Sequence, residues 1–204
     1  MADNLRNSRE RYGKVAQWLH WIMAFLILAT YIAIYYRAWF TEPRTPPSSM
    51  ALQIHMSLGF YLFTLVILRL IWKLTNNSPD PVAGPAWQQA SARWTHRLFY
   101  VFLLLMPITG YIFAGLGNEF FYNTPIAFEL IPKFSDTQAF QAIVVNGFGI
   151  SDEAWRNARE PFKDFHVIVG GIVLVALFVL HIGAALYHQY VLRDGTLHRM
   201  TRQD

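Results

Sequence analysis

Four histidines stand inside long apolar stretches of this 204-residue chain, where few other side chains can bind a metal. They are His20, His55, His166 and His181. An ionisable residue within a membrane-length apolar segment is a functional-site hypothesis by default. The chain contains no cysteine, which excludes disulfides, thiolate metal sites, iron–sulfur clusters and thioether-linked haem. Any redox cofactor must therefore be held by other ligands, and histidine is the obvious candidate.

The histidines lie in segments long enough to cross about 30 Å of hydrocarbon as helices. The predicted spans cover residues 15–36, 50–73, 94–116 and 165–190. A basic N-terminal segment runs into the first span without a small-residue cleavage site, which predicts an uncleaved span. The fold class is therefore predicted to be an all-α membrane protein, a four-transmembrane-helix bundle that forms a single domain over residues 1–204.

The distribution of positive charge predicts the orientation of the spans. Eleven Lys and Arg residues fall on the side that carries both termini, and six fall on the other side. The positive-inside rule then places both termini in the cytoplasm, most simply in a bacterial inner membrane. The net charge of +4 is thus explained by membrane topology, and lipid rather than nucleic acid is the expected partner. The C-terminal RDGTLHRM is predicted to be a lipid-facing basic segment.

The outer connection between spans 3 and 4 is long, covering residues 117–164. It is rich in aromatic residues and is predicted to form a folded cap; a plain loop is the alternative. Within it, Ser151 is the expected N-cap of a short helix, with Asp152 and Glu153 in the first turn.

Depth in the membrane pairs the four histidines. On an ideal helix His166 and His181 differ by only about 60° in direction, but by about 22 Å in depth. The topology sets His55 beside His166 at the outer level and His20 beside His181 at the inner level. Two such pairs suit two six-coordinate irons with neutral imidazoles as axial ligands. Gly59 and Gly170, one turn after His55 and His166, would leave room for a flat macrocycle.

Other interpretations of these residues remain open. A pair of histidines is a poor zinc site without carboxylate or thiolate partners, and the four spans contain no Asp or Glu. A membrane histidine can also be a hydrogen-bonded packing residue. Arg69 is predicted to face inward near the inner pair and to bind a haem propionate, with snorkelling to the headgroups as the alternative.

Three further residues near the inner interface are candidates for quinone binding or proton transfer: His96, His188 and Arg193. His188 shares the helix face of His181, which favours a functional role. His96 can equally be an interfacial side chain without a function.

The combination of motifs resembles the prokaryotic cytochrome b-561 family, whose members are four-helix di-haem cytochromes. The motifs are Leu19-His20-Trp21, Ile54-His55 with Gly59 and Arg69, His96 with Pro107 and Gly110, His166, His181, Tyr187-His188 and RDGTLHRM. The resemblance implies two non-covalent haems b, with the same four histidines as axial ligands. It further implies electron transfer between the periplasmic side and ubiquinone, and similar members resemble superoxide oxidase.

Two features depart from this family. His166 and His181 are 15 residues apart where 14 is expected, and a π-type bulge near Gly170 and Gly171 would absorb the difference. The outer side also lacks the positive excess that would steer superoxide. Only one local group of positive charges could steer superoxide on that side: Arg156, Arg159 and Lys163.

The leading hypothesis is a membrane electron-transfer enzyme that links an outer donor, with superoxide as the candidate, to ubiquinone. The second is an electron-transfer subunit without its own catalysis, which serves a periplasmic dehydrogenase or carrier. The third, disfavoured by the lack of carboxylates in the spans, is a non-haem metal or proton transporter.

Overall fold

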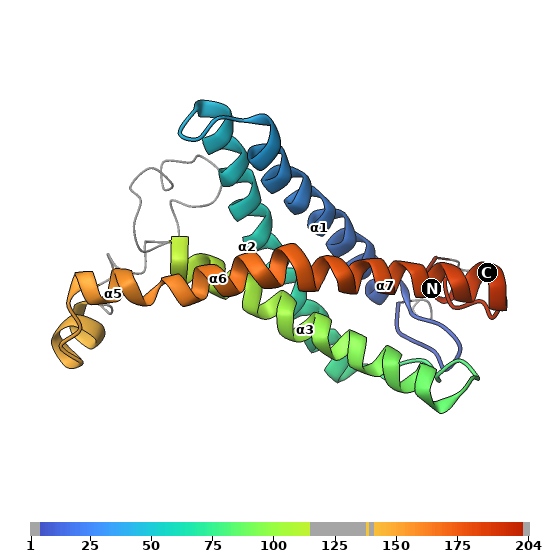
Figure 1. Ribbon diagram of the computed structural model, residues 1–204. Coiled ribbons are helices and arrows are strands. Elements are labelled where there is room, and N and C mark those ends of the chain that lie inside the picture. Colours follow the sequence, from blue (N-terminus) through green and yellow to red (C-terminus); the bar gives the residue numbers. More distant parts are fainter. Residues whose placement is uncertain (1–4, 115–137, 139–140, 202–204) are drawn as a thin grey trace. The chain divides into compact units, whose positions relative to one another are not determined.

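The protein is built from helices, four of which are long and apolar enough to cross a membrane (Figure 1). The computed structural model describes residues 5–114, 138 and 141–201, and there is no strand within these ranges. The membrane-length helices are α1 (Lys14–Phe40), α2 (Pro46–Thr75), α3 (Ala86–Ala114) and a continuous run over Glu160–Leu192. The prediction of an all-α protein with four spans is therefore confirmed.

The fourth span changes helix type along its length. It consists of α6 (Glu160–Ile168), the π-helical turn η6 (Val169–Val173), α7 (Leu174–Tyr187) and a second π-helical turn, η7 (His188–Leu192). The remaining elements are short: η5 (Gln141–Gly147), α5 (Asp152–Ala158) and α8 (His198–Thr201). Part of the predicted cap, at 117–137 and 139–140, lies outside the described residues.

The long helices expose apolar stripes. On α1, Phe25, Leu28 and Ile32 follow helical spacing and are each at least 59% exposed. On the fourth span, Ile172, Val179 and Leu180 are at least 66% exposed. Apolar surface of this extent fits contact with lipid rather than with water.

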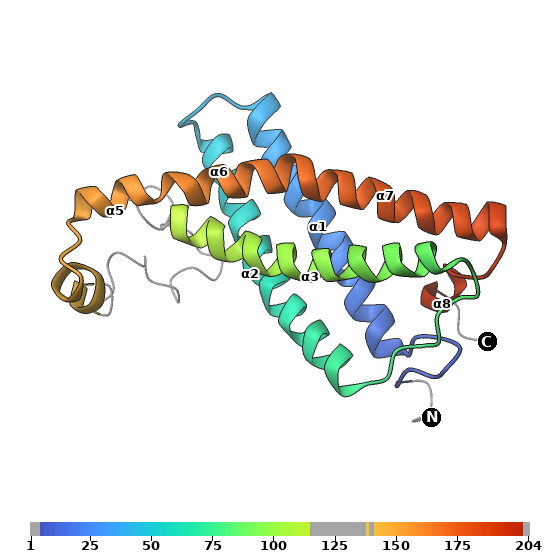
Figure 2. The same ribbon diagram turned by 60° about the horizontal axis from the view of Figure 1, so that its bottom comes forward.

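The chain divides into two compact units, and each long helix contributes to both. Unit 1 comprises residues 1–26, 62–104 and 172–204, and unit 2 comprises residues 27–61 and 105–171. In unit 1, α3 and α7 run side by side, and Phe99 stacks on Phe178 with ring centroids 5.1 Å apart (Figure 2). In unit 2, α2 begins with Pro46 and Pro47, where proline suits the first helical turn because no intrahelical N–H bond is lost.

The predicted helix N-cap at Ser151, which precedes α5 in unit 2, is confirmed. Ser151 has an extended backbone, and its hydroxyl accepts a hydrogen bond from the Ala154 amide at 3.1 Å. This bond satisfies one of the amides that the first turn of a helix leaves without a partner.

The segment after span 4 was predicted to face lipid, but in unit 1 it folds back onto protein. Trp21 donates its indole N–H to the Met200 carbonyl at 2.9 Å, and the Tyr12 amide donates to the Arg199 carbonyl at 3.3 Å. Arg199 in turn donates to the Asp80 carbonyl at 2.7 Å, in the connection between α2 and α3. The turn at 193–197 reverses the chain, so that carbonyls of α8 accept from Trp21 on α1 and from Tyr12 just before it. Contact of this basic segment with lipid stays a prediction.

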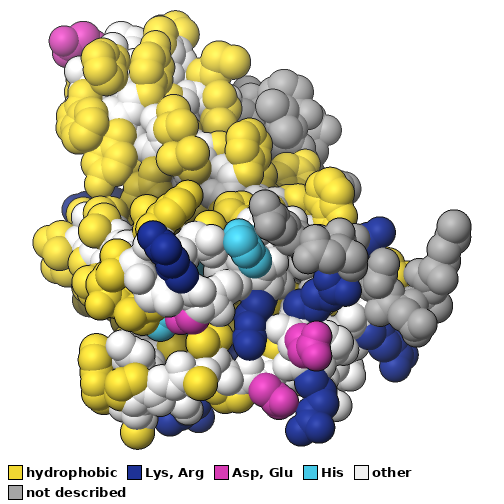
Figure 3. All heavy atoms as spheres, turned by 90° about the vertical axis from the view of Figure 1, so that its right-hand side faces the viewer, with side chains coloured by type: hydrophobic (Ala, Val, Ile, Leu, Met, Phe, Trp, Pro, Cys, Tyr) yellow, Lys and Arg dark blue, Asp and Glu magenta, His cyan; other side chains and the backbone are white. Residues whose placement is uncertain are grey.

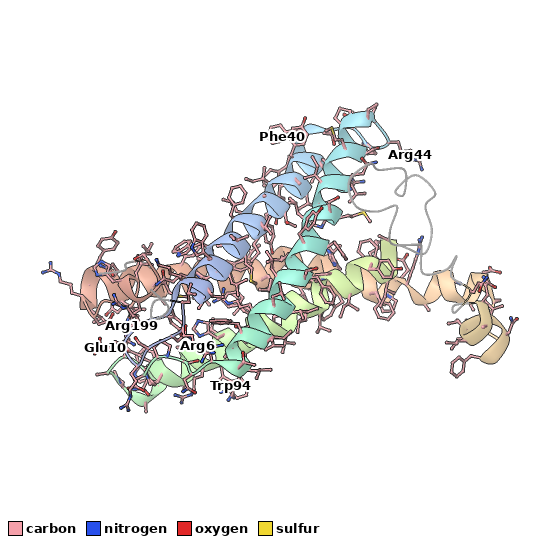
Figure 4. All side chains as sticks on the ribbon, turned by 180° about the vertical axis from the view of Figure 1, so that it is seen from behind. Arg6, Glu10, Phe40, Arg44, Trp94 and Arg199 are labelled. Atoms are coloured by element: carbon pink, nitrogen blue, oxygen red, sulfur yellow. The ribbon has the colours of Figure 1, made fainter. Side chains whose placement is uncertain are left out.

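Positive charge surrounds this folded tail. Figure 3 looks onto the part of unit 1 that carries both termini, where Lys and Arg side chains gather beside an apolar face. Figure 4 labels Arg6, Glu10 and Arg199 in the same unit. Burial raises the pKa of Tyr12, which lies under the tail, so its hydroxyl stays neutral.

Candidate functional site

His55 on α2 and His166 on α6 face each other in unit 2. Their ring centroids are 6.2 Å apart, and the ring planes are inclined by 76°. Two imidazoles that bind one metal through Nε2 from opposite sides have ring centres about 6.2 Å apart, because each metal–nitrogen bond is ~2.0 Å and each ring centre lies ~1.1 Å behind its nitrogen. The spacing of this pair therefore fits a single metal between the rings.

Backbone carbonyls orient both rings of this pair. His55 Nδ1 lies 3.1 Å from the Thr30 carbonyl, and His166 Nδ1 lies 2.9 Å from the Met106 carbonyl. Since a carbonyl oxygen only accepts, each Nδ1 must carry the proton and donate it. The Nε2 lone pairs are then free, which is the arrangement that metal-binding histidines commonly adopt.

The ring of His166 lies in a narrow slot on α3. A Cβ atom on Gly110 would come within 2.9 Å of His166 Cε1, closer than real Cβ contacts. Phe113 meets the same ring edge-on, with centroids 5.3 Å apart. The position of the His166 ring therefore requires a glycine at residue 110.

His20 on α1 and His181 on α7 form an equivalent pair in unit 1. Their ring centroids are also 6.2 Å apart, at an interplanar angle of 67°. His96 on α3 lies on the other side of His181, with centroids 5.7 Å apart. His96 is thus a direct neighbour of this pair rather than a separate interfacial residue.

Arg69 contacts His20 of the His20/His181 pair, in agreement with its predicted inward direction. Its Nη1 donates to His20 Nδ1 at 2.9 Å. Because guanidinium only donates, Nδ1 of His20 must accept, and the proton of the neutral ring then sits on Nε2. Binding of a metal through Nε2 would need the proton to move to Nδ1 and Arg69 to find another acceptor. Among the described residues no carboxylate forms an ion pair with Arg69.

Gly59 and Gly170, both predicted to leave room for a flat macrocycle, differ in their surroundings. Around Gly59 no heavy atom lies within 4 Å of a Cβ position, so space is open beside α2. At Gly170 a Cβ would come within 2.8 Å of Met106 Cε. Gly170 therefore has a packing reason of its own, whereas the open space at Gly59 is what a flat macrocycle beside His55 would need.

The predicted bulge between His166 and His181 is confirmed. The turn η6, at Val169–Val173, is π-helical and contains both Gly170 and Gly171. A π turn accommodates one more residue than an α turn, so it absorbs the fifteenth residue of the spacing.

His188 is oriented by a residue that sequence reasoning missed. The Nδ1 of His188 is hydrogen-bonded to a carboxylate oxygen of Asp194, and the other oxygen accepts from Thr196, from the amide at 3.0 Å and from the hydroxyl at 2.6 Å. Arg193 makes this contact possible because its left-handed backbone, with φ of 55°, turns the chain back toward η7. Arg193 is exposed, so it contributes to this site through its backbone conformation rather than through its side chain.

The carboxyl of Asp194 has a lowered pKa. Partial burial opposes this shift, but the hydrogen bonds from His188 and Thr196 outweigh it. The resulting stabilisation is complete above the unfolded pKa of about 3.9 and is lost as the pH falls through the lower folded value. Asp194 is thus an anion at neutral pH and holds the proton of His188 on Nδ1.

Other cationic residues lie in unit 2, near α5 and α6 and on α1. Arg159 and Lys163, predicted to steer an anion, both form ion pairs with Glu160, at 3.7 and 2.9 Å. The side chain of Arg156 lies outside the described residues. Arg37 on α1, which sequence reasoning also missed, has its Nε buried without a hydrogen-bond partner among the described residues.

The slot on α3 leads to a test with Gly110→Ala. The added methyl must displace the His166 ring and weaken its bond to Met106, at an overpacking cost of about 1–3 kcal/mol. We expect a lower Tm for the purified protein in detergent. Gly183→Ala, on α7, is the control, since its methyl meets no protein atom. Equal Tm values for the two variants would contradict the geometry described for His166.

The sequence profile of prokaryotic cytochrome b561 matches residues 11–203. Cytochrome b561 homolog 1 of Escherichia coli (strain K12) is 29% identical over 192 residues, which cover 93% of this chain and 96% of the relative. A probable superoxide oxidase, CybB of Yersinia pestis, is 25% identical over 94% of this chain and 96% of its own length. Cytochrome b562 of Cereibacter sphaeroides is 24% identical over 94% and 95% of the two chains.

These relatives share nearly their whole length with the present chain, so the similarity covers all four spans and the histidines in them. The chain therefore belongs to the prokaryotic cytochrome b561 family, multi-pass inner-membrane proteins that transfer electrons with haem b.

Proposed function

We propose that this protein binds two haems b, one between His55 and His166 and one between His20 and His181, and passes electrons from an outer donor to ubiquinone. The observation that carries the proposal is the equal spacing of the two pairs, each with ring centroids 6.2 Å apart. Haem b supplies reversible one-electron chemistry when bound. If both histidines of a pair held the iron, substrates would exchange electrons without binding the metal.

The chain's own residues have distinct roles in this proposal. Thr30 and Met106 hold the ligand rings of one pair through their carbonyls. Arg69 would turn from His20 to a haem propionate, because a buried guanidinium needs an anion. We further place the termini in the cytoplasm, on the side favoured by the eleven Lys and Arg residues.

Ubiquinone reduction needs two protons, and His188 is the residue best prepared to deliver one. Asp194 holds its Nδ1 proton, so the second ring nitrogen is free to bind a quinone oxygen or to carry a proton. The side chain of His188 is 24% exposed and is therefore accessible from the surface. The remaining candidate, His96, lies against His181, where it would act on the haem environment instead.

Superoxide is the outer donor that one relative suggests, since the Yersinia pestis protein is named a probable superoxide oxidase. Two superoxide ions would each lose one electron to become oxygen, and the two electrons with two protons would convert ubiquinone to ubiquinol. A second candidate function is electron transfer from a periplasmic dehydrogenase or carrier, without catalysis of superoxide oxidation. The pairing of Arg159 and Lys163 with Glu160 favours it, because this pairing weakens a cationic entry for superoxide.

Ligand assignment is tested by His181→Ala and His55→Ala. We expect each variant to retain one haem per chain and to lose one of two midpoint potentials in a redox titration, since each removes an axial ligand of a different haem. His198→Ala, at the start of α8, is the control and keeps both. Full haem content in either ligand variant, or a single haem in the unmodified protein, would rule out the assignment.

The donor is tested by stopped-flow mixing of the oxidised protein with superoxide, followed by ubiquinone. Superoxide oxidase activity predicts rapid haem reduction by superoxide and reoxidation by ubiquinone over repeated turnovers. Reduction that is no faster than the disproportionation of superoxide would favour the carrier function instead. A purified protein without haem absorbance would refute both functions and leave a metal or proton transporter.

The role of Asp194 is tested with Asp194→Asn. The amide can accept the Nδ1 proton but cannot stabilise a charged His188, so ubiquinone reduction should slow by about 10–100-fold, as is usual when an orienting partner is removed. Haem content and both midpoint potentials should stay unchanged, because Asp194 contacts neither ligand pair. Asp80→Asn, in the connection between α2 and α3, is the control for the loss of one carboxylate charge away from His188. Unaltered quinone reduction in Asp194→Asn would remove His188 from the proposal.

A further inference from the structure

The π-helical turn η6 is bound from outside by Tyr31. The Tyr31 hydroxyl, on α1, donates a hydrogen bond to the Gly170 carbonyl at 2.6 Å. Both residues belong to unit 2. A widened turn disturbs the α-helical ladder, and a backbone carbonyl left without a donor inside a membrane costs free energy. The tyrosine hydroxyl supplies a donor at this point of the helix.

Gly170 is also connected to His166 through Met106. The absence of a side chain at Gly170 admits the Met106 methyl, which would lie 2.8 Å from a Cβ atom there. The carbonyl of the same Met106 accepts the Nδ1 proton of His166 at 2.9 Å. A change in the turn at Gly170 must therefore shift the packing of Met106 and, with it, the acceptor that orients the His166 ring.

We infer that Tyr31 is a positioning residue for His166: its hydroxyl stabilises the π turn, and the turn holds His166 in its slot on α3. The inference rests on the proposed role of His166 as a haem ligand. It explains how this chain accommodates 15 residues between His166 and His181. If the turn returned to α-helical geometry without loss of a residue, the direction of one histidine would change by about 100°.

The first test is Tyr31→Phe in the full-length, haem-loaded protein. Removal of the hydroxyl should shift the midpoint potential and the electron paramagnetic resonance signal of one haem, the one whose signal is lost in His166→Ala, and leave the other unchanged. Amide hydrogen exchange within Val169–Val173 should become faster, because the turn loses its external donor. Tyr36→Phe, at an exposed position on the same helix, is the control and should change neither.

The second test removes the need for the π turn. Deletion of Gly171, whose Cβ position has no atom within 4 Å, restores a 14-residue spacing and should return the segment to an α-helix. In this background Tyr31→Phe should no longer shift either potential, because no widened turn remains to be stabilised. The two changes are thus expected to be strongly non-additive.

Several outcomes would overturn the inference. They are unchanged potentials in Tyr31→Phe, unchanged exchange at Val169–Val173, or an equal shift with and without Gly171. If the deletion prevents folding, the midpoint potentials and the hydrogen exchange of Tyr31→Phe alone still test the inference. If the protein binds no haem, the proposed function fails, but hydrogen exchange in Tyr31→Phe still tests whether Tyr31 stabilises the turn.

Discussion

Two backbone carbonyls decide which nitrogen of His55 and His166 carries the proton. Because Thr30 and Met106 offer only an acceptor, each ring is fixed in the tautomer whose Nε2 is free. Much of unit 2 can be understood from this constraint. Gly110 leaves space for the His166 ring, and the Thr109 hydroxyl lies 3.4 Å from Nδ1 of that ring. Gly170 has no side chain, so Met106 can approach the helix there.

The His20/His181 pair is organised differently, although its ring spacing is the same. Here a cation, Arg69, contacts the histidine where the other pair has a carbonyl. A guanidinium cannot accept a proton, so this pair favours the opposite tautomer at His20. The two pairs therefore differ electrostatically: carbonyls contact the rings of one pair, and a cation contacts the other.

The general arrangement could be predicted from the sequence, because helical rise and membrane thickness limit which histidines can meet. Depth in the predicted topology paired His55 with His166 and His20 with His181, and the extra residue relative to the spacing expected from the family resemblance indicated the π turn at Gly170. The partners of these residues could not be predicted in the same way. Asp194 reaches His188 only because Arg193 adopts a left-handed backbone, and Tyr31 reaches Gly170 from a helix 139 positions earlier. Such contacts depend on local backbone geometry and side-chain reach, which spacing does not encode.

The folded tail has a consequence for how the protein is made. Each span is apolar enough to enter the membrane by itself as it is synthesised. The backbone partners of Trp21 and Tyr12, however, lie at residues 199 and 200, which follow the last span. Unit 1 can therefore be closed only after all four helices have been inserted. The contacts of the tail with Trp21 and Tyr12 are therefore the last of this unit to become possible in the order of synthesis.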